Sequence, residues 1–89
     1  MQFYVNTFLI KEISNYMVYF RENWEKIIEI WHENFTLFHP EIQILYIYVA
    51  SEAIQKSSLK GKLEYVKGFG DILIEVFKEI VGYLLYNIK

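Results

Sequence analysis

The stretch from Asn23 to Ala53 constrains the fold more than any other part of the chain. Its first half places large apolar residues three and four positions apart, the spacing of one face of an α-helix. These residues are Trp24, Ile27, Ile28, Trp31, Phe35 and Phe38. His39-Pro40 ends this helix, because the residue before a proline is disfavoured in the helical region, and Pro40 suits the first position of a new helix. The second half is apolar nearly all round and too long for an ordinary strand, so it predicts a buried helix.

Helical spacing continues upstream of this pair. An apolar stripe runs in phase towards Trp24 and is formed by Leu9, Ile13, Tyr16 or Met17, and Phe20. One uninterrupted helix from Thr7 to Phe38 would fit this pattern. We favour two helices with a break near Arg21-Glu22-Asn23, where Asn23 could cap the second one, because a single run beyond 25 residues is unusual in so short a chain.

Downstream, Lys56-Ser57-Ser58 is the predicted loop, with a serine available as N-cap. The 3.6-residue period then continues from Leu59 to Ile88 and predicts a long final helix. Within it, Gly68-Phe69-Gly70-Asp71 indicates either a kink or the close approach of another helix. The sequence therefore predicts an all-α fold of three to four antiparallel helices in a small bundle, forming one domain over residues 1–89.

Composition sets the expected partners. The chain has 89 residues, of which 54% are hydrophobic, more than a monomer of this size can hide, so we expect a homo-oligomer or a ligand cavity. The longest apolar run, Ile44 to Ala50, predicts no membrane span, and a net charge of −2 argues against direct nucleic-acid binding.

The basic cluster of Lys56, Lys60, Lys62 and Lys67 indicates a solvated loop or, as an alternative, a surface for an acidic partner. With no cysteine and no signal peptide, a cytoplasmic location is expected.

No pattern in the sequence points to catalysis. Glu29 and His32 have the spacing used by di-iron bundles, but a second pair and two more glutamates would be needed. Gly68-x-Gly70 lacks the third glycine of a dinucleotide fingerprint, and no histidine is placed to activate a serine. We therefore predict no enzyme, no catalytic residue, no metal and no cofactor.

The aromatic residues, 19% of the chain, are the more informative set. Aromatic side chains at helical spacing usually form a core, yet bulky rings at crossing helices also line cavities for apolar ligands. The stripe before Pro40 must meet the apolar helix after it and the final helix. Trp31, Phe35, Tyr46 and Phe69 are the large side chains expected to converge there as a ligand pocket.

Residues 23–53 and 59–81 together resemble the C-terminal ligand-binding domain of tetracycline-repressor (TetR) family regulators, over roughly residues 21–81. The resemblance rests on an amphipathic helix ending before His39-Pro40-Glu41, an apolar helix closing on Ser51-Glu52-Ala53, and a long helix with Tyr65 in its second turn. It implies a pocket for a small hydrophobic molecule and a helix-turn-helix upstream. The chain departs from the family in lacking that DNA-binding domain and the last two helices of the dimer interface.

Two hypotheses follow from these observations. The first is the ligand-sensing and dimerisation portion of a TetR-like transcriptional regulator. The alternative is a small helical structural or protein-interaction module that forms a homodimer and binds no ligand. A cavity within one protomer would favour the former, and a filled core with a dry interface between copies the latter.

Overall fold

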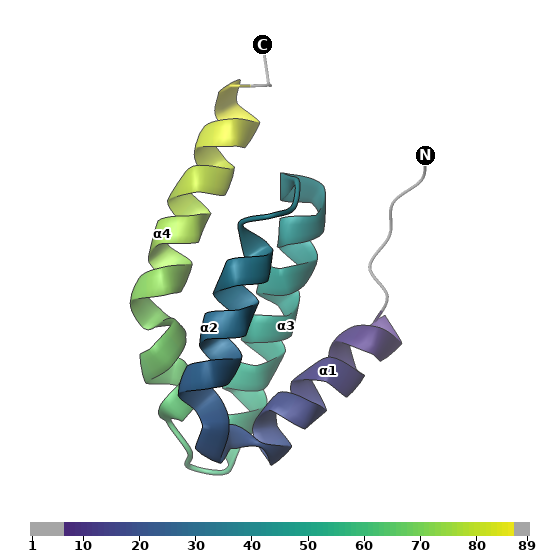
Figure 1. Cartoon of the computed structure of the whole chain (residues 1–89), viewed down its shortest axis with the longest axis vertical. Helices are drawn as coiled ribbons and strands as arrows, with labels where there is room; N and C mark the ends of the chain where they lie inside the picture. The colour runs from purple at the N-terminus through teal and green to yellow at the C-terminus, as the bar shows by residue number, and fades with distance from the viewer. Residues whose placement is uncertain (1–6, 87–89) are drawn as a thin grey trace.

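The structure, a computed structural model, describes residues 7–86, without the side chains of residues 83 and 84. Within that range the chain forms four α-helices and no strand, which confirms the predicted all-α fold. The elements are α1 (Thr7–Tyr19), the short 3-10 helix η1 (Arg21–Asn23), α2 (Trp24–Phe35), α3 (Pro40–Leu59) and α4 (Glu64–Tyr86). Helices α2, α3 and α4 run up, down and up along the long axis, and α1 lies tilted beside the lower part of α3 (Figure 1).

The break between α1 and α2 lies where the sequence predicts it. The turn of 3-10 helix at Arg21–Asn23 separates the two helices, and the amide of Asn23 donates to the carbonyl of Phe20 at 2.9 Å. Asn23 occupies the N-cap position of α2, but its side chain makes no capping hydrogen bond, so its predicted role as a cap is wrong. The turn bonds the first amides instead, since the amide of Trp24 donates to the carbonyl of Arg21.

The turn between α2 and α3 follows the predicted proline chemistry. His39 is extended, with φ −69° and ψ 157°, and Pro40 opens α3 with Glu41 in its first turn. Gln43 then reaches back, and its Nε2 donates to the carbonyl of Phe35 at 2.9 Å. That bond satisfies a carbonyl at the end of α2 which has no partner within its own helix.

The turn between α3 and α4 lies later than predicted. Residues 56–58 belong to α3, and Ser57 is buried with its hydroxyl donating to the carbonyl of Ala53 at 2.8 Å. The turn instead uses Gly61, whose φ of +73° favours glycine. The amides of Gly61 and Lys62 donate to the carbonyls of Ser58 and Ser57, the paired bonds of a Schellman motif. The loop prediction failed because a buried serine was mistaken for a cap.

Helix α4 passes through Gly68 and Gly70 without interruption, so the predicted kink is absent and the close approach is present. A β-carbon on Gly68 would lie 2.9 Å from the ring of Trp24 and closer still to Ile28. Glycine therefore lets α4 pack against α2. The end of the predicted helix at Ile88 lies outside the described residues.

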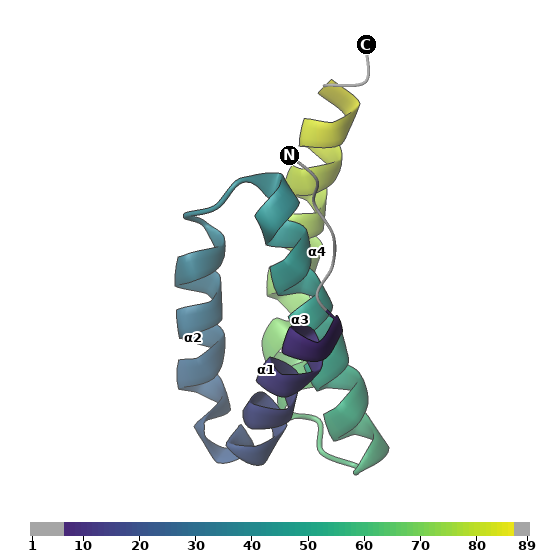
Figure 2. The same cartoon turned by 90° about the vertical axis from the view of Figure 1, so that its right-hand side faces the viewer.

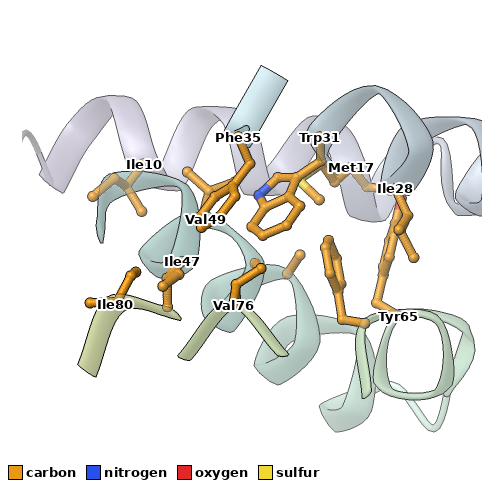
Figure 3. Close-up of a cluster of buried hydrophobic side chains, with 13 residues drawn as sticks. Ile10, Met17, Ile28, Trp31, Phe35, Ile47, Val49, Tyr65, Val76 and Ile80 are labelled. Atoms are coloured by element: carbon orange, nitrogen blue, oxygen red, sulfur yellow. The ribbon is translucent and has the colours of Figure 1, made fainter. Parts of the chain in front are cut away.

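The core lies between α2, α3 and α4, with α1 closing one side (Figure 3). Ala50 and Ala53 on α3 are fully buried and have short side chains, so neighbouring helices approach closely there. Around them lie the larger core side chains Ile28, Trp31, Phe35, Ile47, Tyr65, Phe69, Val76 and Ile80. No helix among the described residues is long and apolar enough to cross a membrane.

The inner face predicted for α1 is wrong except for Met17, which was the alternative to Tyr16 and is buried. Leu9, Ile13, Tyr16 and Phe20 are exposed, whereas the buried residues of α1 are Ile10, Ser14, Met17 and Val18. The helix is rotated from the predicted orientation because it packs chiefly on α3, as the second view shows (Figure 2). This rotation leaves an aromatic face of α1 in solvent.

Candidate functional site

The four predicted pocket residues come together in the structure. The ring centroid of Trp31 lies 5.0 Å from that of Phe35, 6.0 Å from that of Tyr46 and 5.0 Å from that of Phe69. Trp31 Nε1 donates to the carbonyl of Tyr46 at 2.9 Å. Partial burial raises the pKa of the Tyr46 hydroxyl. Trp31, Phe35 and Phe69 are buried, so these rings pack as part of the core.

A hollow of about 400 Å³ lies beside this cluster, between α1, α2 and α3. Its walls are almost wholly apolar, with Ile10, Ile13 and Ile30 among them. Of the predicted pocket residues, Trp31 and Tyr46 line the hollow, whereas Phe35 and Phe69 are not part of its wall. That these four residues bind a ligand stays a prediction.

A second feature lies where α3 meets α1, and it is centred on Lys56. The Lys56 ammonium donates to Asn15 Oδ1 at 2.6 Å, to the Ser14 hydroxyl at 2.9 Å and to the carbonyl of Lys11 at 3.2 Å. Glu52, one turn earlier on α3, places Oε2 3.7 Å from the same ammonium. Lys56 therefore holds α1 against α3, and Asn15 is fixed at the surface beside it.

Around this junction the surface combines exposed rings with cations. One depression is lined by Asn15, Val18, Tyr19, Arg21, Lys56, Leu59 and Lys60. A shallower one adjoins it and is lined by Glu12, Asn15, Tyr16, Tyr19 and Phe20. These two depressions share Asn15 and Tyr19, and we call them together the α1–α3 surface. Tyr19 is 76% exposed and Tyr16 63%, so large rings stand in solvent on a helix whose other face is docked.

The rings of the α1–α3 surface are ordered against one another. Phe20 lies edge-on to Tyr19 with centroids 4.8 Å apart and is stacked with Tyr16 at 6.5 Å. Among the described residues, Arg21 and Lys60 form no ion pair. Exposed tyrosine and arginine are enriched where proteins bind other proteins. This surface is therefore suited to holding a chain that offers apolar groups and negative charge.

The residues considered for metal chemistry lie apart from this surface. Glu29 pairs with Lys26 at 3.0 Å on the exposed face of α2. The described residues contain no group of three or more histidine, cysteine or acidic side chains that could hold a metal ion.

Together, these features describe a small all-α domain with exposed rings on one surface, beside cations that the described residues leave unpaired. The family model described as the CID domain matches residues 6–84, nearly the whole chain. The chain therefore belongs to the CID domain family.

The chain is also similar in sequence to curated relatives. The chain is 25% identical over 71 residues to regulation of nuclear pre-mRNA domain-containing protein 1A from cattle and from human, which is 80% of this chain and 22% of each relative. It is 22% identical to protein 1B of that name from mouse, with the same coverage of both chains. The chain thus spans about a fifth of the length of these relatives. No solved structure matches the chain significantly.

The family match corrects the resemblance to TetR regulators. The helices before and after His39-Pro40-Glu41 do lie as predicted, but they belong to a CID domain and not to a TetR ligand-binding domain. The expectation of a TetR-like ligand sensor is therefore wrong. An amphipathic helix, a proline and an apolar helix form a pattern that several all-α folds share, so it could not distinguish them.

Little in the sequence predicts the α1–α3 surface. The cluster containing Lys56 and Lys60 was a partial signal, because its alternative interpretation was an acidic partner. No sequence signal points to the exposed rings of α1, because the apolar spacing predicts Phe20, with Tyr16 or Met17, in the core. Their exposure depends on the rotation of α1, which the Lys56 contacts help to set.

Proposed function

We propose that this chain is a protein-interaction module that binds a peptide segment of its partner, of the type found in the C-terminal domain of RNA polymerase II. The observation that carries the proposal is the match of the CID family model over residues 6–84, since that family comprises interaction modules for the polymerase C-terminal domain. On this proposal the chain is no enzyme, and it acts by holding its partner.

The α1–α3 surface is the proposed binding site. Tyr16, Tyr19 and Phe20 offer apolar area with little conformational freedom to lose, and Asn15 presents an amide beside them. Arg21 and Lys60 flank these groups as cations that the described fold does not pair. A phosphorylated or otherwise acidic peptide complements that arrangement, because a guanidinium binds a phosphate with two parallel hydrogen bonds.

The relatives also bear on where the chain works. Their names refer to the regulation of nuclear pre-mRNA. A module that acts on the same class of target would work where transcripts are made, so we propose a site of transcription in place of the cytoplasmic location expected from composition. Localising the tagged chain by microscopy tests this.

Peptide binding can be measured by fluorescence anisotropy with labelled peptides copied from the polymerase C-terminal domain. We expect the phosphorylated peptide to bind more tightly than the unphosphorylated one, and the double variant Arg21→Ala, Lys60→Ala to lose about tenfold or more in affinity for it, given the ~1.5–3 kcal/mol of a charged hydrogen bond. Tyr19→Ala should weaken both peptides because it removes apolar contact.

The matched control is Lys26→Ala, which removes one cation from the exposed face of α2, away from the proposed site. Its affinity for either peptide should equal that of the native chain. Equal losses in Lys26→Ala and in the Arg21, Lys60 double variant would show non-specific charge attraction only. Absence of binding to either peptide would overturn the proposed function.

A further inference from the structure

Helix α4 carries two apolar faces, and the fold uses one of them. Tyr65, Phe69, Val76 and Ile80 point into the core and are buried. A second row faces solvent and consists of Leu63, Val66, Ile74, Phe77, Val81 and Leu85, each between 38% and 63% exposed. We call these six residues, together with Gly70 in the same row, the outer stripe. The outer stripe follows α4 along nearly its whole length, and α4 itself lies on the opposite side of the molecule from α1 (Figure 1).

The spacing of the outer stripe is regular. Positions 63, 66, 70, 74, 77, 81 and 85 are separated by three, four and four residues, twice over. This is an 11-residue repeat, which keeps a stripe nearly parallel to the helix axis. A second straight helix could therefore contact the stripe from one end to the other.

Gly70 lies within the outer stripe, and neither the packing nor the backbone conformation of the described fold requires a glycine at this position. A β-carbon at Gly70 would have no atom of the described chain within 4 Å, and its φ is not positive. Gly68, by contrast, is required by the packing of Trp24 and Ile28. A glycine in an exposed helix interior weakens that helix. Close approach of another helix at Gly70 would account for it, since small residues let helix backbones come together.

The stripe is complementary to itself when two copies run antiparallel. With the two-fold axis between Glu75 and Val76, Ile74 of one copy lies opposite Phe77 of the other, and Gly70 lies opposite Val81. The same register sets Val66 opposite Leu85. Each of these pairs sets a smaller side chain against a larger one, and each pair occurs twice across the axis, as in a self-complementary two-fold interface.

The charges beside the stripe favour the same arrangement. Asp71, Glu75 and Lys78 are exposed along one edge of the stripe. In an antiparallel pair, like edges of the two helices meet. Lys78 of one copy then lies between Asp71 and Glu75 of the other, so opposite charges face each other on both sides of the axis. A parallel pair would bring the charged edge of each copy against the uncharged edge of the other.

The area available is sufficient for pairing. If a fully exposed large apolar side chain offers roughly 200 Å², the six side chains offer on the order of 600 Å² per copy at the exposures observed. If pairing covers all of this area it buries up to about 1,200 Å² in total, which reaches the lower limit of specific, stable protein interfaces. We propose that two copies of this chain pair antiparallel through the outer stripe of α4. No residue of the stripe lines the α1–α3 surface, so this proposal stands apart from the proposed function.

Sedimentation velocity of the full chain over micromolar concentrations tests the pairing. We expect a dimer for the native chain and a monomer for Ile74→Glu, Phe77→Glu, with unchanged helical circular dichroism because both residues are exposed. Leu37→Glu is the matched control, since Leu37 is 76% exposed and lies at the turn after α2. A monomeric native chain at about 200 μM, or equal dissociation by the Leu37 control, would overturn the proposal.

Gly70→Ala tests the pairing a second way, because it should stabilise the monomer and weaken the dimer. In a helix without a partner, alanine should raise the melting temperature of the monomer by about 4–8 °C. If Gly70 contacts the second copy, the same change should weaken dimerisation at least tenfold. Dimerisation that is unchanged or tighter in Gly70→Ala would contradict the pairing described here.

Because the chain has no cysteine, disulfide trapping can test the orientation. A mixture of the Asp71→Cys and Lys78→Cys chains should form a mixed disulfide-linked dimer on mild oxidation. Asp71→Cys alone should crosslink poorly, since the two copies of position 71 lie on opposite sides of the axis. Val81→Cys reports the other orientation, because two copies of this stripe position face each other in a parallel pair, whereas the antiparallel register sets Val81 opposite Gly70. Efficient crosslinking of Val81→Cys with itself, without the mixed Asp71–Lys78 crosslink, would indicate a parallel pair and overturn the antiparallel arrangement.

Discussion

The hydroxyl of Tyr65 donates a hydrogen bond of 2.5 Å to the backbone carbonyl of Met17, joining the start of α4 to the end of α1 across 48 residues. Met17 is among the last four residues of α1, whose carbonyls lack partners within the helix. Tyr65 therefore satisfies one end of α1 from another helix. The tyrosine is fully buried, so water does not replace the bond.

Tyr65→Phe should lower the free energy of unfolding by about 1–3 kcal/mol, because it leaves the Met17 carbonyl buried without that partner. Urea unfolding followed by circular dichroism measures the change. Tyr48→Phe is the control, since Tyr48 is half exposed on α3. A loss as small as that of the control would show that the hydrogen bond contributes nothing to stability.

Tyr65 should also make the protein sensitive to alkali. Burial, with a smaller contribution from Glu64, raises the pKa of Tyr65 to about 12, whereas an unfolded tyrosine titrates near pH ~10. The folded state therefore resists deprotonation, and its stability is complete below pH ~10 and falls between about 10 and 12. The loss attributable to Tyr65 should reach about 2–3 kcal/mol.

The measurement is urea unfolding at pH 9, 10, 11 and 12 for the native chain and for Tyr65→Phe. Other tyrosines and the lysines titrate in both proteins, so the difference between the two curves isolates Tyr65. The stability gap between them should narrow as the pH rises. A constant gap would mean that Tyr65 titrates normally.

The sequence predicted the helices and most of the core, but not how α1 is oriented. Trp31, Phe35 and Phe69 were placed correctly at the centre because α2 and α4 are amphipathic and Pro40 fixes the turn between α2 and α3. In α1, apolar residues lie on several faces, so periodicity did not decide which face is buried. Hydrogen bonds from Lys56 and Tyr65 set which face of α1 is buried, and both residues lie more than forty positions from their partners in α1.

Gly61→Ala should destabilise the fold by about 1–2 kcal/mol, because its φ of +73° places an added β-carbon against the following carbonyl. Gly82→Ala is the matched control. Gly82 is helical, and no described atom lies within 4 Å of its β-carbon position, so alanine there should stabilise by up to ~1 kcal/mol. Thermal unfolding of both variants checks the opposite signs.

Lys56→Met should cost about 1–3 kcal/mol, since it leaves Ser14 and Asn15 without the ammonium that bridges them to α3. Lys60→Met, one turn later and exposed, should have almost no effect on stability. Chemical denaturation measures both. If Lys56→Met matched Lys60→Met, the contacts of Lys56 would be incidental to the docking of α1.

The candidate site was less predictable than the fold for a related reason. Asn15 and Tyr19 are unremarkable in sequence, and they become neighbours of Lys60 only when α1 docks on α3. The aromatic cluster around Trp31 was predictable because it follows from packing. The meeting of these rings does not indicate a function, since buried rings also form an ordinary core.

The docking of α1 over such long sequence separations also implies an order of folding. Residues 60–63 alone separate α3 from α4, so these helices close a short loop and can pair early, whereas the Lys56 and Tyr65 contacts to α1 span 41 to 48 residues. Helix α1 should therefore dock last and exchange its amide hydrogens first. The α1 half of the proposed peptide site is then formed in the final step of folding. A bound peptide would therefore stabilise the docked state of α1, the helix that undocks most readily.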